Sequence, residues 1–72
     1  MTPKRFYRVK RFQRAVSLAK NQAVVNWGTL VYECGFFDQS HLIRDFHEFS
    51  GASPSDYLRS QSELRENHVI LA

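Results

Sequence analysis

The chain has 72 residues, of which 43% are hydrophobic and 14% aromatic, and its formal net charge at pH 7 is +3. Its length allows one domain near the lower limit for a self-sufficient core, which excludes most enzymes. The hydrophobic content is too high for a disordered chain, and charges interrupt it too often for a membrane span. The single cysteine, Cys34, excludes an internal disulfide. Because no signal-peptide-like stretch opens the sequence, we expect a cytoplasmic protein that does not act at a membrane.

The charges are unevenly distributed along the chain. Residues 1–20 hold seven basic residues and no acidic ones, whereas residues 21–72 hold three basic and seven acidic residues. The two parts therefore carry +7 and −4 (3 − 7). Such a positive field typically meets phosphate, in nucleic acid or on an anionic membrane. A basic helix face that contacts solvent alone is the simpler interpretation.

Residues 3–21 are predicted to form one long amphipathic helix. The segment has no glycine and no internal proline, and its apolar residues recur at steps of three and four. These residues are Phe6, Val9, Phe12, Ala15, Val16 and Ala19. Roughly opposite this apolar face lies a row of basic side chains, here called the basic ridge. The basic ridge consists of Lys4, Arg8, Arg11 and Arg14, with Lys10 alongside.

Capping residues predict two further helices. Asn26 is a suitable N-cap for a helix that ends at Gly35. Asp38 is a suitable N-cap for a helix that ends at Gly51, where a left-handed conformation is needed. A short helix, a turn that begins with glycine and a second helix with a polar first turn are typical of a helix-turn-helix unit.

The rest of the chain is predicted to add a fourth helix and a tail. The Ser-Pro-Ser-Asp sequence at 53–56 places a hydroxyl at the N-cap and proline at the first helical position. This helix is expected to end near residue 62. We therefore expect one all-α domain of three or four helices over residues 1–62 and a tail of unknown structure over residues 63–72.

In a helix-turn-helix unit, the second helix presents the side chains of its N-terminal part to the major groove. On the helix after Asp38, we expect Leu42, Phe46 and Phe49 to face inward. The outer face and its margins carry the candidates for base contacts: Gln39, Ser40, Ile43, Arg44 and His47. Glutamine pairs with adenine, arginine with guanine, and isoleucine can touch a thymine methyl group. An ordinary helical hairpin with a polar outer face explains the same spacing equally well.

Two stretches of this region resemble the C-terminal signature of AraC/XylS-family transcription regulators. They are Gly35-Phe36-Phe37-Asp38-Gln39-Ser40-His41-Leu42-Ile43-Arg44-Asp45-Phe46 and Phe49-Ser50-Gly51-Ala52-Ser53-Pro54-Ser55-Asp56-Tyr57. Upstream, Arg11, Ala15 and Leu18 resemble the Arg-x-x-x-Ala-x-x-Leu pattern of the linker helix in that family. The resemblance covers residues 2 to about 60.

The resemblance implies a homeodomain-like helix-turn-helix fold and a function in sequence-specific binding of double-stranded DNA. In that family, two helix-turn-helix units are joined by a linker helix, and this chain resembles the linker helix and the second unit. The implied recognition helix covers residues 38–50 and lies in the major groove. The candidates for phosphate contacts are the four residues of the basic ridge: Lys4, Arg8, Arg11 and Arg14.

The alternative is a protein-interaction module with weak or no DNA binding. Residues 26–62 hold two arginines against five acidic residues, so this half of the chain is repelled by phosphate. Three apolar side chains also extend the apolar surface of the first helix beyond what the other helices can cover: Phe6, Val9 and Leu18. We therefore expect self-association through this helix, or docking of the tail residues Val69-Ile70-Leu71 onto it. A partner subunit, a longer relative or RNA polymerase would be other partners.

The histidines and the cysteine give no sign of a metal site or a catalytic centre. His41 and His47 are six residues apart, so they do not share a helix face. His41 and Asp45 are four apart, which predicts a weak ion pair on the surface. Cys34, beside the turn glycine, is expected to be a small core residue. We therefore expect no metal, no cofactor and no enzymatic activity.

Overall fold

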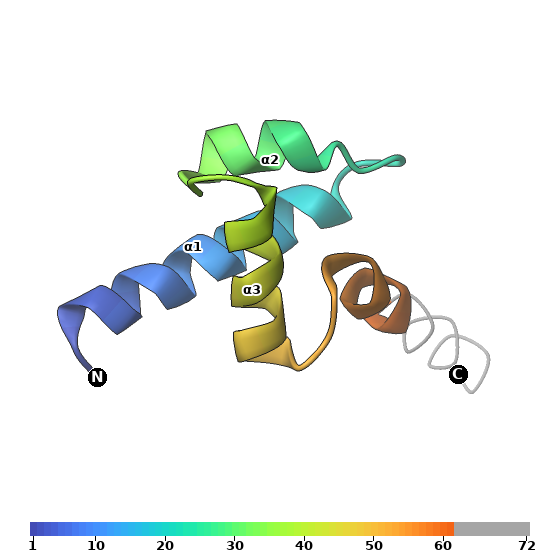
Figure 1. Cartoon of the computed structure of the whole chain (residues 1–72). Helices are drawn as coiled ribbons and strands as arrows, with labels where there is room; N and C mark the ends of the chain where they lie inside the picture. Colours follow the sequence, from blue (N-terminus) through green and yellow to red (C-terminus); the bar gives the residue numbers. More distant parts are fainter. Residues whose placement is uncertain (62–72) are drawn as a thin grey trace.

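The computed structural model describes residues 1–61, which fold into a small helical domain (Figure 1). Its helices are α1 (Pro3–Lys20), α2 (Trp27–Cys34) and α3 (Gln39–Ser50), and residues 54–61 are helical as well. This part of the chain contains no strand, so the all-α prediction is confirmed. The predicted tail over residues 63–72, with its Val69-Ile70-Leu71 sequence, lies outside the described residues.

The helices α2 and α3 begin and end at the predicted capping residues. The side-chain oxygens of Asn26 and Asp38 accept hydrogen bonds from the backbone N–H groups three residues later, at 3.0 and 2.8 Å. Gly35 and Gly51 end the two helices with φ angles of 83° and 77°. Residues with a Cβ atom rarely adopt this left-handed conformation, so glycine is required at both ends. The turn between α2 and α3 is thus fixed by a glycine at its start and an aspartate at its end.

Phe46 of α3 lies at the centre of the core. Its side chain is fully buried, and its ring makes edge-on contacts with Phe12, Tyr57 and Trp27, at centroid distances of 4.8, 6.0 and 6.1 Å. These rings belong to α1, to the helical residues 54–61 and to α2, so Phe46 joins α3 to every other helix described. Further buried side chains complete the core: Ala15, Val16, Ala19, Leu30, Cys34, Phe36 and Leu42.

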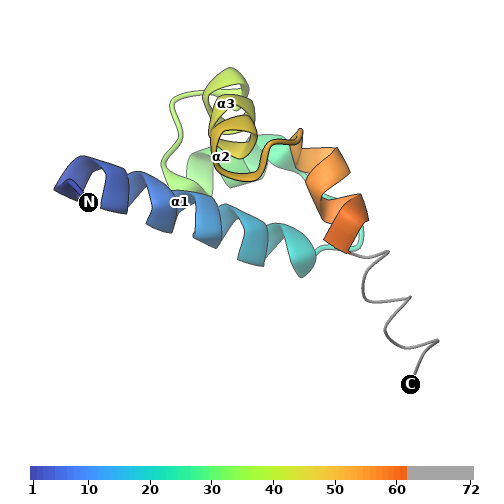
Figure 2. The same cartoon turned by 90° about the horizontal axis from the view of Figure 1, so that it is seen from below.

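The N-terminal half of α1 projects beyond the other helices. In two views at right angles, the first turns of α1 extend past α2, α3 and residues 54–61 (Figures 1 and 2). Phe6 and Tyr7 are exposed on it, which agrees with the prediction for Phe6. Leu18, by contrast, packs against the core, so the prediction that it adds to the uncovered apolar surface is wrong. The large apolar side chains that α1 exposes are thus Phe6 and Tyr7, both in its N-terminal half.

We predict that Phe46→Ala lowers the free energy of unfolding by about 3–5 kcal/mol, because it leaves a cavity among three aromatic rings. The matched control is Phe37→Ala, since the Phe37 side chain is 89% exposed and its loss should change stability by about 0.5 kcal/mol or less. Urea unfolding followed by circular dichroism measures both. Equal losses for the two variants would contradict the central position of Phe46.

Candidate nucleic-acid interface

One face of α3 packs on the core and the opposite face is open to solvent. Leu42, Asp45 and Phe46 are buried on the inner face. All five residues predicted to contact bases are exposed: Gln39, Ser40, Ile43, Arg44 and His47. Because the buried residues anchor α3, the structure brings these five side chains together on one surface of an immobilised helix.

Two grooves border this open face of α3. The larger, of about 620 Å³, lies between α1 and α3 and has Arg44 on its wall. It is lined mainly by charged side chains: Lys4, Arg8, Arg11, Arg44, Asp45 and Glu48. The smaller, of about 200 Å³, has Gln39 and Ile43 on its wall and reaches Trp27 and residues 53–55. The charged groove is here called the α1–α3 groove.

A buried carboxylate lies at the base of the α1–α3 groove. Asp45 is 1% exposed, and its two oxygens accept hydrogen bonds from Arg8 at 3.0 Å and from Arg11 at 2.8 Å. Burial raises the pKa of Asp45, but the hydrogen bonds from Arg11 and Arg8 outweigh burial and leave the pKa below its usual value. The carboxylate is therefore ionised at neutral pH, and its two ion pairs join α3 to α1.

Arg11 also contacts the turn before α3. Its guanidinium carbon lies 4.7 Å from the centre of the Phe36 ring, and one of its terminal nitrogens lies 2.8 Å from Nε2 of His41. The other ring nitrogen of His41 lies 3.1 Å from the backbone nitrogen of Phe37. A neutral imidazole has a single unprotonated nitrogen, so His41 accepts a hydrogen bond from one of these donors at a time. Arg11 thus positions the turn as well as α3.

A second and more exposed set of ion pairs lies beside Asp45. Glu48, with a side chain that is 41% exposed, accepts hydrogen bonds from Arg5 at 3.2 Å and from Arg8 at 3.0 Å. Both guanidinium carbons lie 5.2 Å from the centre of the Phe49 ring. The hydrogen bond from Arg8 is the main cause of the lowered pKa of Glu48, and Glu48 in turn raises the pKa of Arg8. Arg8 therefore bridges the buried and the exposed carboxylate.

Comparison with known protein families shows which family the chain belongs to. The family model described as "Helix-turn-helix domain", of the AraC type, matches residues 1–60. The chain belongs to this AraC-type helix-turn-helix family. No curated protein and no solved structure matches the chain. The match over residues 1–60 confirms the resemblance to AraC/XylS regulators. This family consists of DNA-binding transcription regulators and is not a family of enzymes.

In this AraC-type domain, the basic ridge is not one continuous free surface. The spacing along α1 placed the ridge away from the apolar side chains, but Arg8 and Arg11 instead contact α3. Lys4 and Arg14 are exposed and form no ion pair within residues 1–61. Within residues 1–61, the structure thus divides the ridge into two cations with an ion pair and two without one.

The predicted ion pair between His41 and Asp45 is present as a long contact, but its predicted place on the surface is wrong. Asp45 is buried, and its arginine partners are closer to it than His41, whose Nε2 lies 4.0 Å from its carboxylate. The role of Asp45 at the α1–α3 contact was missed, although its position between Leu42 and Phe46 puts it on the inner face of α3. Phe37 is exposed in the turn at the N-terminal end of α3, and it too was not predicted as a residue of the nucleic-acid interface.

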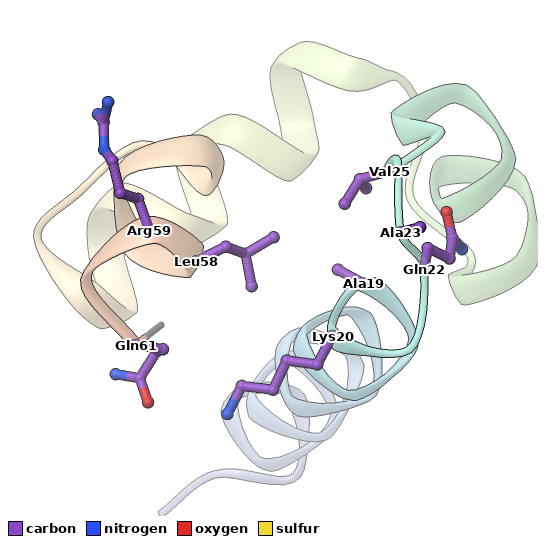
Figure 3. Close-up of a pocket in the computed structure, with 8 residues that line it drawn as sticks. All are labelled: Ala19, Lys20, Gln22, Ala23, Val25, Leu58, Arg59 and Gln61. Atoms are coloured by element: carbon purple, nitrogen blue, oxygen red, sulfur yellow. The ribbon is translucent and has the colours of Figure 1, made fainter. Parts of the chain in front are cut away.

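A third groove lies at the C-terminal end of α1, away from the α1–α3 groove. It has a volume of about 240 Å³ and is bounded by the loop after α1 and by the helical residues 54–61 (Figure 3). Ala19, Val25 and Leu58 point toward one another across it, whereas Arg59 points away (Figure 3). None of the residues predicted to contact bases or phosphate lines this groove.

Residues 1–61 contain no group of three side chains placed to hold a metal ion. Within the same residues, no helix has the length and hydropathy needed to cross a bilayer.

We predict that Asp45→Asn lowers the free energy of unfolding by about 3–5 kcal/mol, because it leaves two arginines without their buried counter-charge. The control is Asp56→Asn, since Asp56 forms its ion pair with Arg59 on the surface and should contribute about 0.5 kcal/mol. Chemical denaturation at pH 7 measures both. A loss below 1 kcal/mol for Asp45→Asn would show that the buried ion pairs contribute little to stability.

The lowered pKa of Asp45 predicts a loss of stability in acid. The unfolded-state pKa of an aspartate is about 3.9, so the contribution of Asp45 is complete above that pH and is lost as the pH falls through the lower folded-state value. As the pH is lowered from about 6 to about 2, the free energy of unfolding should therefore fall more steeply in the wild type than in Asp45→Asn. Identical slopes for both proteins would be inconsistent with the ion pairs described.

Proposed function

We propose that the chain binds double-stranded DNA in a sequence-specific manner, with α3 in the major groove as its recognition helix. The main support is the open face of α3, where five exposed side chains lie together on a helix anchored by Asp45 and Phe46. The major groove is about 12 Å wide and admits one α-helix with its side chains. The DNA-binding character of the AraC-type family agrees with this proposal.

The chemistry of the five side chains suggests how bases are distinguished. Gln39 offers both a donor and an acceptor to adenine, and Arg44 offers a pair of donors to guanine. Ile43 provides an apolar contact for a thymine methyl group, and Ser40 and His47 can hydrogen-bond to neighbouring base edges. Gln39 and Ser40 form the first turn of α3, which is the part of a recognition helix that enters the groove most deeply.

The four residues of the basic ridge are proposed to contact phosphate, and their expected contributions to phosphate binding differ. Lys4 and Arg14 are exposed, and neither is engaged in an ion pair within the part of the chain that is described. Arg8 already contacts Asp45 and Glu48, but its side chain is 27% exposed. Arg11 is 10% exposed and is bound to Asp45. We therefore assign Arg11 the smallest contribution to phosphate binding.

The alternative, a protein-interaction module, is supported by the exposure of Phe6 and Tyr7 on the projecting half of α1. The repulsion of phosphate by the acidic half of the chain is reduced, because Asp45 and Glu48 are paired with arginines of α1. Sedimentation over a concentration series, with Phe6→Glu as the variant expected to disrupt a dimer, tests self-association. Contact with RNA polymerase stays a prediction.

The direct test of DNA binding is a fluorescence anisotropy titration of mixed-sequence duplex at low and moderate salt. A single recognition helix should give weak binding, with a dissociation constant of about 10⁻⁴ to 10⁻⁶ M near physiological salt. Selection from a random duplex library then identifies preferred sequences. The absence of binding at low salt would overturn the proposal and favour the protein-interaction module.

Base and phosphate contacts are predicted to respond differently to mutation. Arg44→Ala and Gln39→Ala should each cost about 1–3 kcal/mol at the preferred base and reduce discrimination among sequences. Lys4→Ala should weaken binding to every duplex alike and lower the slope of log K against log salt by about one unit. The control is Lys20→Ala, which removes the same charge at the opposite end of α1 and should change the salt slope less than Lys4→Ala does. Uniform effects of all four substitutions on all sequences would argue against base recognition by α3.

A further inference from the structure

Glu48 lies in the α1–α3 groove, which is otherwise rich in cations. Lys4, Arg8, Arg11 and Arg44 line the same groove, and Arg5 reaches Glu48 from the adjacent turn of α1. The groove borders the open face of α3, with Arg44 belonging to both. If α3 enters the major groove of DNA, the neighbouring α1–α3 groove therefore lies where a backbone phosphate runs past the helix.

The two acidic residues of this groove differ in how firmly they are held. The Asp45 side chain is 2% exposed and binds an arginine at each oxygen, whereas the Glu48 side chain is 41% exposed. Exposed ion pairs contribute little to stability and are easily exchanged, but breaking a buried one is costly. Glu48 can therefore leave its arginines while Asp45 stays in place.

The arginines around Glu48 also have contacts that do not involve it. Arg5 and Arg8 both lie over the ring of Phe49, and Arg8 also donates to Asp45. Each arginine donates one hydrogen bond to Glu48, from Nη1 of Arg5 and from Nη2 of Arg8, and phosphate oxygens accept such hydrogen bonds from guanidinium groups as carboxylate oxygens do. The contacts that Glu48 makes with Arg5 and Arg8 are thus the contacts that a phosphate group would make in its place.

We propose that the α1–α3 groove is a phosphate site in which Glu48 acts as an internal competitor, and that a DNA phosphate displaces the Glu48 carboxylate from Arg5 and Arg8. Asp45 holds Arg8 and Arg11 throughout, so α3 keeps its orientation during the exchange. The proposal rests on the proposed DNA-binding function. Its consequence is that Glu48 lowers the affinity for DNA without taking part in base recognition.

The test compares Glu48→Gln with the wild type in titrations of mixed-sequence duplex at low salt. We expect Glu48→Gln to bind about tenfold more tightly. Asp56→Asn, which removes the same charge from an exposed position on the helical residues 54–61, should change affinity by about twofold or less. Thermal unfolding checks that both variants are folded. Equal effects of the two substitutions would overturn the proposal.

A mutant cycle with Arg5 separates competition from simple repulsion between Glu48 and DNA. If Glu48 competes for arginine, its substitution should improve affinity clearly less in an Arg5→Gln background, by about threefold. If Glu48 only repels phosphate, the full tenfold gain should remain, and the proposal fails. Failure of the wild type and every variant to bind at low salt would instead reject DNA binding itself.

A direct measurement follows the Glu48 carboxyl group by carbon NMR as the pH is varied, with and without duplex. Arg8 lowers the pKa of Glu48 in the free protein. Displacement by phosphate should return that pKa toward its usual value when DNA is bound. An unchanged or lower pKa in the complex would show that the carboxylate keeps its arginine partners, and would overturn the proposal.

Discussion

The buried carboxylate of Asp45 determines how α3 lies on α1. An unpaired charge at this depth would strongly destabilise the fold, so Asp45 requires the two arginines that reach it. Arg8 and Arg11 lie one turn apart on α1 and bind different oxygens of the same carboxylate. Two attachments of this kind restrict both the position of α3 and its rotation about its own axis. The outward orientation of Gln39 and Arg44 is a consequence of that restriction.

The same ion pairs explain the unequal distribution of charge along the chain. Three of the seven basic residues of the N-terminal segment are paired with acidic residues of α3. The acidic half of the chain, in turn, gives Asp45 and Glu48 to these pairs. Among the described residues, the cations of the two helices that form no ion pair include Lys4, Arg14 and Arg44, and these are the ones available for the proposed attraction of phosphate. The electrostatic field of the domain is therefore weaker than a count over residues 1–20 indicates.

Local sequence signals were sufficient to predict the helices and the open face of α3. Helix ends follow from residues close in sequence, as Asp38 and Gly51 show, and the face of a helix follows from its period. The contact between α1 and α3 could not be predicted in this way, because Arg11 and Asp45 are 34 residues apart and helical spacing rules apply within one helix. One signal was nevertheless present. Asp45 is an acidic residue on an apolar face, and the N-terminal segment was the richest source of a cation for it.

The difference in exposure between Asp45 and Glu48 has consequences for how salt acts on the domain. Salt screens charges that contact solvent and has much less effect on buried pairs. An increase in ionic strength therefore weakens the pairs of Glu48 and the attraction of free cations for DNA together, while the pairs of Asp45 persist. The orientation of α3 should thus be maintained over a range of salt in which the proposed phosphate binding changes greatly. Burying one carboxylate and exposing the other would allow a domain of this size to keep the proposed recognition helix fixed while the proposed contacts with phosphate stay reversible.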